Sequence, residues 1–211
     1  MEYNIIQDAL GTHIDWQHEG VTAKMIDWFW SNMEKGFLLW HPEEHEPLTW
    51  ALPPKQGNLI GAVHIAPQTW SDGTRQNLYI RFEELAEVPD DVKQYIVYEH
   101  VMVVAGLGFG PESMVDPKPL GYRLHQWQKS DAGVVGKSTA IGKRKPETPE
   151  QGMVWAKHCI GEIGNWGAFL PQLYKLYQVV KNPAYNPYTD LTVEGTGVAA
   201  KYKYITQERE E

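Results

Sequence analysis

Two residues with metal-binding side chains stand four positions apart in a segment that has a helical pattern. They are His158 and Glu162, and residues at this spacing lie one turn apart on a single face of a helix. An imidazole nitrogen and a carboxylate oxygen placed in this way can bind one divalent metal ion together. An exposed His–Glu pair is the alternative, because such pairs are common helix stabilisers. Aromatic and small apolar residues that crowd the same side favour the metal site: Trp155, Cys159, Trp166 and Phe169.

The segment that positions this pair is predicted to be one long helix from Thr148 to Lys181. Thr148 is a suitable N-cap, Pro149 occupies the first helical position, and Gln151 completes a capping box. A core-facing stripe recurs at helical spacing at Ala156, Ile160, Ile163, Gly167, Leu170 and Tyr174. Each glycine costs about 1 kcal/mol relative to alanine in a helix. Close approach of another element, or a cavity beside the helix, would account for Gly161, Gly164 and Gly167.

A zinc site usually collects three or four ligands, often from distant segments. Five further histidines are available to complete it: His41, His45, His64, His100 and His125. Each of them taken singly is more commonly a hydrogen-bonded core or surface residue. A serine hydrolase is disfavoured, because the chain has no Gly-x-Ser-x-Gly element and neither Ser113 nor Ser138 has a helper at recognisable spacing. Cys159 points about 100° away from its neighbour on a helix and is interpreted as a buried small hydrophobe.

The composition is that of a globular protein that encloses an aromatic or apolar ligand. The chain has 211 residues, which suits one domain with short extensions. A net charge of −8 argues against a nucleic-acid partner, which requires a basic face. Nine Trp, eleven Tyr and five Phe are a heavy aromatic load, suited to an apolar pocket as well as to a core. The single cysteine excludes a disulfide framework, and we expect a cytoplasmic protein with no signal peptide or membrane span.

The remainder of the chain is predicted to form a helix followed by an antiparallel sheet. The helix spans residues 20–35, and an apolar run over residues 37–45 ends in a polar turn at Pro42. Strands are expected at residues 48–52, 59–65, 78–83, 95–104, 121–127 and 134–141. Residues 1–19 are interpreted as a polar extension, residues 20–181 as the domain, and residues 182–211 as a surface wrap with a solvated tail. This order predicts an α+β fold in which a curved sheet grips a long C-terminal helix.

Three segments resemble the 2,4-diacetylphloroglucinol hydrolase and phloretin hydrolase family. The first is Val21 to Trp30 followed by the element Leu-Trp-His-Pro-x-x-His at residues 39–45. The second is Gly121-Tyr-Arg-Leu-His-Gln-Trp127, and the third is His158-Cys-Ile-Gly-Glu162 followed by Phe169-Leu-Pro171. The third segment is the most specific of the three. Together they extend over about residues 20 to 177.

The resemblance implies a helix-grip (Bet v 1-like) fold around one zinc ion and hydrolysis of a carbon–carbon bond between an acyl group and a phenolic ring. It implies that His158 and Glu162 are zinc ligands and that His41, or with less support His45, is a third. His125 corresponds to the substrate-side histidine of the family, placed to hold a phenolic hydroxyl or to move a proton.

The chain departs from the family where another zinc ligand, a glutamate, is expected. Gln68, or its neighbour Pro67, stands near that position, and a neutral glutamine is a poor zinc ligand. Either the site is weakened or another residue substitutes, with His45, His64 and Asp72 as the alternatives. The strand that carries Ser138 also lacks the bulky residues usual in the family, which indicates a different substrate or reaction.

The sequence therefore predicts a zinc-dependent hydrolase of an acylphenol or β-diketone-like compound. His125 or Glu44 is expected to be the general acid, and Trp28, Trp40 and Trp127 either line the pocket or fill the core. Two other functions stay open. One is a non-catalytic small-molecule binding protein of the same fold. The other is a metal-dependent cyclase, isomerase or decarboxylase of polyketide-like phenols. The expected partner is a small aromatic molecule, not a membrane, and the sequence leaves a homodimer open.

Overall fold

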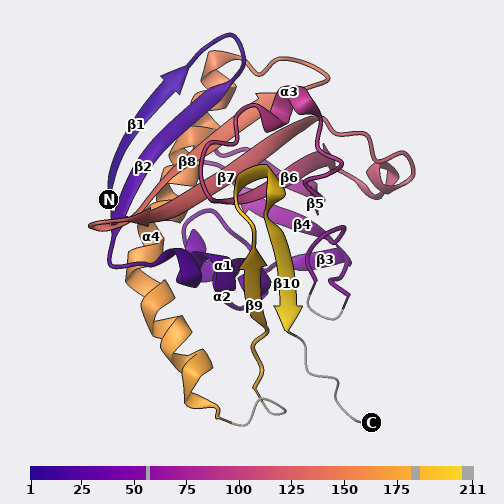
Figure 1. Ribbon diagram of the computed structural model, residues 1–211. Helices are drawn as coiled ribbons and strands as arrows, with labels where there is room; N and C mark the ends of the chain where they lie inside the picture. Colours follow the sequence, from indigo (N-terminus) through magenta and orange to yellow (C-terminus); the bar gives the residue numbers. More distant parts are fainter. Residues whose placement is uncertain (56–57, 182–185, 206–211) are drawn as a thin grey trace.

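An eight-stranded antiparallel sheet forms the body of the protein (Figure 1). The computed structural model describes residues 1–55, 58–181 and 186–205. The strand order across the sheet is β1-β2-β8-β7-β6-β5-β4-β3. The strands are β1 (Glu2–Gln7), β2 (Thr12–Glu19), β3 (Thr49–Leu52), β4 (Val63–Thr69), β5 (Arg75–Phe82), β6 (His100–Gly108), β7 (Gly121–Ser130) and β8 (Gly133–Gly142). A separate hairpin consists of β9 (Asp190–Glu194) and β10 (Lys201–Ile205).

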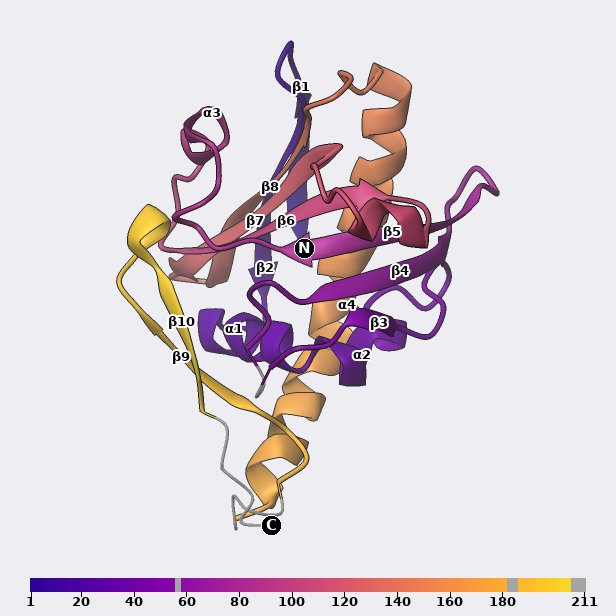
Figure 2. The ribbon, with the colours of Figure 1, turned by 90° about the vertical axis from the view of Figure 1, so that its right-hand side faces the viewer.

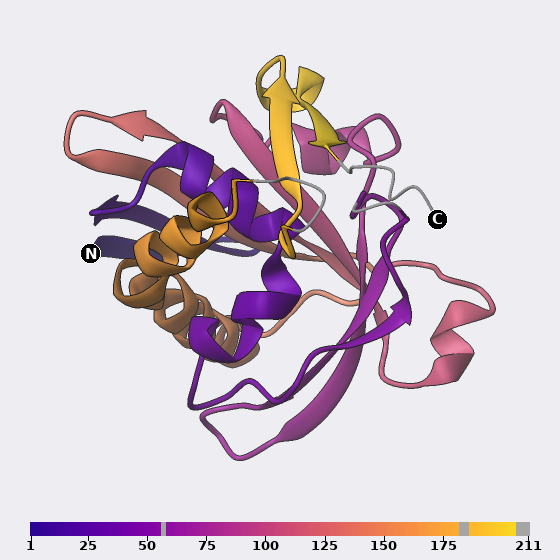
Figure 3. The ribbon, with the colours of Figure 1, turned by 90° about the horizontal axis from the view of Figure 1, so that it is seen from below.

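The long helix α4 (Pro149–Val179) crosses the sheet and packs against β2 and α2. The helices before it are α1 (Ala23–Ser31), α2 (Met33–Trp40) and the short α3 (Asp90–Lys93), with 3₁₀ turns η1 (Pro111–Met114) and η3 (Gly197–Ala199). From below, the strands curve around α1, α2 and α4 (Figure 3). This is the helix-grip (Bet v 1-like) arrangement of the α+β class that the sequence predicts. No helix among the described residues is long and apolar enough to cross a membrane.

Helix α4 forms where its capping residues and apolar stripe indicate. The Thr148 hydroxyl accepts the Gln151 N–H at 3.3 Å, and the Gln151 side chain accepts the Thr148 N–H at 3.0 Å. Reciprocal bonds of this kind satisfy donors that a helix start otherwise leaves unpaired. The buried face of the helix carries both residues of the predicted metal pair. It comprises Gly152, Trp155, Ala156, His158, Cys159, Glu162, Ile163, Trp166, Phe169, Leu170 and Leu173.

The two faces of the sheet carry separate hydrophobic clusters. The larger cluster fills the concave side between the sheet and helices α1, α2 and α4, and its most deeply buried side chains include Trp28, Trp127 and Trp166. The smaller cluster lies on the other face, beneath the segment that contains α3 and beside the β9–β10 hairpin (Figure 2). The predicted metal residues therefore belong to the aromatic, concave side of the sheet.

Residues 1–19 are not the irregular extension that the sequence predicts. Strand β1 pairs with β2, and β2 pairs with β8, so this segment completes one edge of the main sheet. The pattern was hidden because buried polar residues in β2 interrupt the apolar alternation. His13, for example, is 6% exposed, and its Nδ1 lies 3.2 Å from the Thr139 hydroxyl. The domain therefore begins at the first strand and not at residue 20.

Other boundaries also differ from the expected ones. The predicted helix over residues 20–35 is two helices that meet at Asn32, and the expected strand over 95–104 begins only at His100 and continues to Gly108. The C-terminal wrap contains the β9–β10 hairpin, which contacts α1. The rest of the predicted wrap and tail, residues 182–185 and 206–211, lies outside the described residues.

A buried carboxylate connects α1 to the centre of the sheet. Asp27 is 4% exposed and accepts hydrogen bonds from Trp127 Nε1 at 3.1 Å and from His100 Nδ1 at 2.9 Å. The hydrogen bond and the negative charge of Asp27 raise the pKa of His100 above its ordinary value, although burial opposes this. The charge of Glu99 acts in the same direction. His100 is therefore a structural residue and not a zinc ligand.

We expect His100→Gln to destabilise the protein more at pH 5.5 than at pH 9. A raised pKa means that folding favours the imidazolium, so its stabilisation is complete below about pH 6.5 and is lost as the pH rises through the folded-state pKa. A hydrogen bond to a charged group contributes about 1.5–3 kcal/mol, which sets an upper limit for the loss at pH 5.5 because His100 is partly exposed to solvent. Urea unfolding at the two pH values measures this difference. Lys137→Gln is the control, because its 3.1 Å pair with Asp15 is partly exposed and should contribute little at either pH.

Candidate metal centre

Helix α4 buries both members of the predicted metal pair. His158 and Glu162 are 5% and 6% exposed, and His158 Nε2 lies 3.3 Å from Glu162 Oε1. A solvent-exposed helix-stabilising pair is therefore excluded. Because buried carboxylates are costly unless they are paired, this pair requires further partners from other elements.

His45 is the third member of the cluster, and it comes from the turn that follows α2. Its Nε2 lies 3.3 Å from Glu162 Oε1, and one ligand atom from each of His45, His158 and Glu162 lies within 4.8 Å of the others. His45 Nδ1 lies 2.8 Å from the carbonyl oxygen of Phe37. A carbonyl only accepts, so Nδ1 carries a proton, and Nε2 is the nitrogen that faces Glu162.

Glu44 sets the orientation of His158 in a corresponding way. Its Oε2 lies 2.6 Å from His158 Nδ1, on the opposite side of the ring from Glu162. A carboxylate that accepts the second ring N–H of a histidine is the usual outer partner of a zinc ligand. The two 3.3 Å separations also match the edge of a tetrahedron whose metal–ligand bonds are about 2.0 Å long. The donor set of two imidazoles and one carboxylate therefore fits zinc.

The charges of the cluster place a proton where a metal ion would bind. Burial opposes the charge of His158, but Glu162 and Glu44 outweigh it and raise the pKa of His158 to about 9. His158 and His45 in turn hold the pKa of Glu162 well below its usual range against the effect of burial. Without a metal ion, His158 is therefore an imidazolium between two carboxylates. A zinc ion must displace that proton to bind Nε2.

His41, which the resemblance favours as the third ligand, lies beside the cluster in a different role. Its ring stacks on His158 with centroids 4.8 Å apart and planes 7° apart. The backbone N–H of Glu44 donates to His41 Nδ1 at 3.2 Å, and burial together with the charge of His158 lowers the pKa of His41. Without a metal ion the ring therefore carries its proton on Nε2. His41, Glu44 and His158 also place ligand atoms within 4.8 Å of one another, so His41 stays a candidate ligand beside His45, which is the histidine that faces Glu162.

The alternative fourth ligands are distributed unequally around the cluster. Asp72 is exposed in the turn between β4 and β5, and its carboxylate accepts the Thr74 N–H at 2.8 Å, so it takes no part. Gln68 is 5% exposed and pairs with His45 in an isolated β-bridge, so it lies beside the cluster as the sequence predicts. His64 is 5% exposed, and its Nδ1 has no hydrogen-bond partner among the described residues. Burial lowers the pKa of His64 to about 3, so it is neutral.

His125 lies in β7 on the concave face of the sheet. Its ring centroid is 5.5 Å from that of Trp30, and its Nδ1 lies 3.2 Å from the Ser138 hydroxyl. Burial lowers the pKa of His125 to about 4, with a smaller opposing effect from Glu162. His125 is therefore a neutral side chain near the cluster at neutral pH.

Of the three predicted pocket tryptophans, Trp40 lies closest to the metal cluster, with its ring 5.7 Å from His45. Trp28 packs instead among Tyr174, Tyr177 and Tyr188, and Trp127 donates its N–H to Asp27. Sequence reasoning missed two others. Trp70 lies 4.8 Å from the His158 ring, and Trp30 lies against both Trp40 and His125. Their position could not be inferred from spacing, because both elements reach the cluster only through tertiary packing.

Four of these five indoles leave a donor unused. The buried Nε1 atoms of Trp28, Trp30, Trp40 and Trp70 have no hydrogen-bond partner within the described part of the chain, and the last three of them lie near the metal cluster. Buried donors are nearly always paired, so each is a candidate for a bond to an acceptor that the protein itself does not supply.

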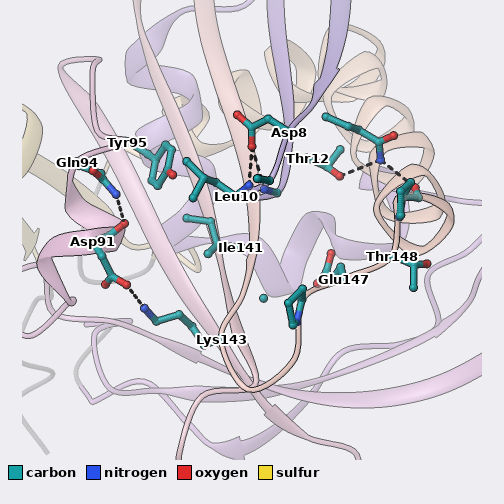
Figure 4. A pocket seen from close by; sticks show the side chains of 16 residues that line it. Asp8, Leu10, Thr12, Asp91, Gln94, Tyr95, Ile141, Lys143, Glu147 and Thr148 are labelled. Atoms are coloured by element: carbon teal, nitrogen blue, oxygen red, sulfur yellow. Dashed lines mark hydrogen bonds and ion pairs between the residues drawn. The ribbon is translucent and has the colours of Figure 1, made fainter.

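A cavity of about 310 Å³ lies elsewhere, at the start of α4 (Figure 4). Its walls include Asp8, Leu10 and Tyr95, and the Lys143 side chain reaches across to Asp91. None of the metal-cluster residues lines this cavity. The Asp8 carboxylate already accepts the backbone N–H groups of Leu10 and Gly11, and Gln7 donates to the Pro149 carbonyl oxygen. These polar groups are thus satisfied within the protein, whereas the buried hydroxyl of Tyr95 has no hydrogen-bond partner among the described residues.

We expect Glu44→Gln to weaken zinc binding by about 10- to 100-fold while leaving the fold intact. Loss of an outer-shell carboxylate typically has this effect, because the ligand histidine loses both its orientation and part of its basicity. Zinc affinity is measured by competition with a chromophoric chelator. Glu43→Gln is a matched control on the neighbouring residue, which is exposed. Equal affinities for Glu44→Gln and the wild type would show that Glu44 does not act on His158.

Comparison with known proteins finds structural likenesses only. No protein-family model and no curated protein sequence matches the chain. Protein Ms6760 from Mycobacterium smegmatis has a TM-score of 0.52 at 16% identity, over 81% of this chain and 96% of that one. Ara h 8.0201 has a TM-score of 0.48 at 12% identity, over 76% and 97% of the two chains. The di-domain ARO/CYC StfQ from the steffimycin biosynthetic pathway has a TM-score of 0.47 at 11% identity, over 79% and 53%. At these identities the likeness extends to the fold and not to an activity.

Proposed function

We propose that this protein is a zinc-dependent hydrolase that cleaves the carbon–carbon bond between an acyl group and a phenolic ring. The observation that carries the proposal is the buried cluster of His45, His158 and Glu162. Nδ1 of His45 and Nδ1 of His158 are each hydrogen-bonded to an acceptor. Nε2 of each ring therefore faces Glu162 Oε1, at 3.3 Å in both cases. A purely structural ion pair does not require two histidines oriented in this manner.

Zinc bound here would polarise a carbonyl group and lower the pKa of a bound water towards about 7. The residues of the chain then have separate roles. Glu44 is ionised, because its hydrogen bond with His158 lowers the pKa of Glu44 against the effect of burial. It therefore has no proton to deliver in the resting protein, and the general-acid role predicted for it from the sequence requires it first to take one up.

The atoms of the reaction balance without a further reactant. The oxygen of water joins the acyl carbon, the bond from that carbon to the ring carbon breaks, and the ring carbon takes the proton. The products are a carboxylic acid and a phenol. His125 is neutral, so its contribution is a hydrogen bond to an oxygen of the substrate and not the delivery of a proton. The aromatic rings of Trp30, Trp40 and Trp70, which pack around the cluster, are of a kind that suits contact with a planar phenolic ring.

The test is product analysis with a panel of acylphenols, including acylphloroglucinols. We expect stoichiometric carboxylic acid and deacylated phenol, loss of activity after chelation, and recovery on addition of zinc. Cyclised, isomerised or decarboxylated products from the same panel would replace hydrolysis by another metal-dependent reaction. Binding of the compounds that persists in chelator, with no turnover after zinc addition, would instead identify a binding protein and overturn the proposal.

A further inference from the structure

Ser138 lies directly across from His125 in the centre of the sheet. The two residues are paired in the register of β7 and β8, Ser138 is 0% exposed, and its hydroxyl oxygen is 3.2 Å from His125 Nδ1. A hydroxyl buried at this position can reach few hydrogen-bonding groups. Its hydrogen bonds therefore determine what the imidazole can do.

Trp16 takes one of the two acceptor sites of the Ser138 hydroxyl oxygen. Its Nε1 lies 3.3 Å from the Ser138 hydroxyl oxygen, and an indole N–H can only donate. The position of the indole is itself fixed, because Trp16 lies over Gly136, where a Cβ atom would come within 2.1 Å of the ring. The Ser138 oxygen consequently acts as an acceptor for Trp16. Its own hydrogen is left for a second partner.

Two groups compete for the Ser138 hydrogen. One is His125 Nδ1, and the other is the thiol of Cys159, whose pKa the Ser138 hydroxyl lowers against the larger effect of burial. Sulfur is a weak acceptor, whereas an imidazole nitrogen is a good one, so the hydroxyl donates to His125. The thiol can donate in turn to the second lone pair of the Ser138 oxygen. The chain of donors thus runs from Trp16 through Ser138 to His125.

We propose that Ser138 is a positioning residue that holds His125 in the tautomer with its proton on Nε2. An imidazole that accepts at Nδ1 carries its one proton on the other nitrogen. The hydrogen bond of His125 to another described residue is made through Nδ1, which leaves Nε2 for a further partner. The histidine therefore presents a neutral N–H donor to an oxygen atom of a bound molecule. A neutral imidazole can stabilise developing charge on a substrate oxygen in this way.

This inference rests on the proposed function in one respect only, namely which molecule supplies the oxygen atom that accepts the His125 Nε2–H. The arrangement is directional: His125 is supplied with a hydrogen bond on one side and can donate on the other. It selects ligands with an acceptor oxygen at this position, such as a phenolate or ketone, and disfavours ligands that present an N–H or O–H donor with no acceptor.

The direct test is the tautomer of His125 in the metal-free protein, measured by long-range ¹H–¹⁵N NMR on protein with labelled histidine. The His125 signal is assigned from its absence in His125→Gln. In the wild type we expect a protonated Nε2 and an unprotonated Nδ1. In Ser138→Ala we expect the Nδ1–H tautomer to become populated, and in Ser138→Thr, which keeps the hydroxyl, we expect the wild-type pattern. Thr139→Ala, one residue along β8, is the control and should leave the signal unchanged.

A proton on Nδ1 in the wild type would overturn the proposal, and this measurement does not require any variant to fold. An unchanged tautomer in Ser138→Ala would overturn it as well. Neither result depends on zinc or on substrate. The tautomer can therefore be interpreted even if the protein turns out not to be a hydrolase. In an active enzyme, His125→Gln should lower kcat/KM by about 100-fold. Ser138→Ala should cause a smaller loss, because part of its His125 population retains the productive tautomer.

Discussion

Replacing Glu162 by Gln, or His158 by Ala, is expected to lower the affinity of the protein for zinc by more than about 100-fold. Loss of an outer-shell partner alone reduces affinity by about 10- to 100-fold, and loss of a direct ligand must exceed that. Both side chains are buried, and each faces the other at 3.3 Å, so water cannot easily replace the missing donor. Zinc content of the purified variants and competition with a chromophoric chelator measure the effect.

The same experiment distinguishes the two histidines of the segment between α2 and β3. His45→Ala should lose zinc as severely as His158→Ala, because Nε2 of His45 faces Glu162. His41→Gln should retain most of the affinity, because His41 already accepts a backbone N–H at Nδ1. Circular dichroism must show that each variant is folded. Retention of zinc by His45→Ala with its loss in His41→Gln would restore the ligand assignment that the resemblance implies.

The second large effect concerns two glycines of α4 that respond to the same substitution with opposite sign. A Cβ atom at Gly161 would come 2.5 Å from His41 Nε2, whereas at Gly164 only the Met1 side chain lies within reach, at 3.8 Å. Gly161→Ala should therefore destabilise the protein by about 1–3 kcal/mol through overpacking. Gly164→Ala should stabilise it by up to about 1 kcal/mol, because alanine is the better helix former.

The His41 ring cannot easily move away from a methyl group at residue 161. It stacks on His158 at 4.8 Å and accepts the Glu44 N–H, so displacing it disturbs the metal cluster as well. Zinc affinity should therefore fall in Gly161→Ala and not in Gly164→Ala. Urea unfolding of the two variants, together with the chelator competition, tests both effects. A stabilising Gly161→Ala would show that His41 does not pack against α4.

Local sequence patterns determined the parts of the fold that depend on short-range interactions. The capping box of Thr148 and Gln151 lies within three residues, so its two hydrogen bonds could be predicted and are present. The shared face of His158 and Glu162 follows from helical geometry alone. The last hairpin of the sheet, β7 and β8, was likewise predicted, because its strands are adjacent in the chain. Residues 39–45 are distant from α4 in the chain, and no rule of residue spacing connects the two. That this segment supplies a ligand was implied only by the resemblance.

Properties that depend on contacts between distant segments could be seen only in the tertiary structure. We prefer His45 to His41 as the third ligand because of the Phe37 carbonyl and the Glu44 N–H, whereas both histidines look equivalent in the sequence. The polar residues of β2 concealed a strand because their partners, such as Thr139, lie more than a hundred residues away. The sequence alone therefore specified a long helix that carries an imidazole and a carboxylate. The tertiary structure determined that these groups are buried, which histidine joins them and which way each ring faces, because those properties arise from hydrogen bonds between distant segments.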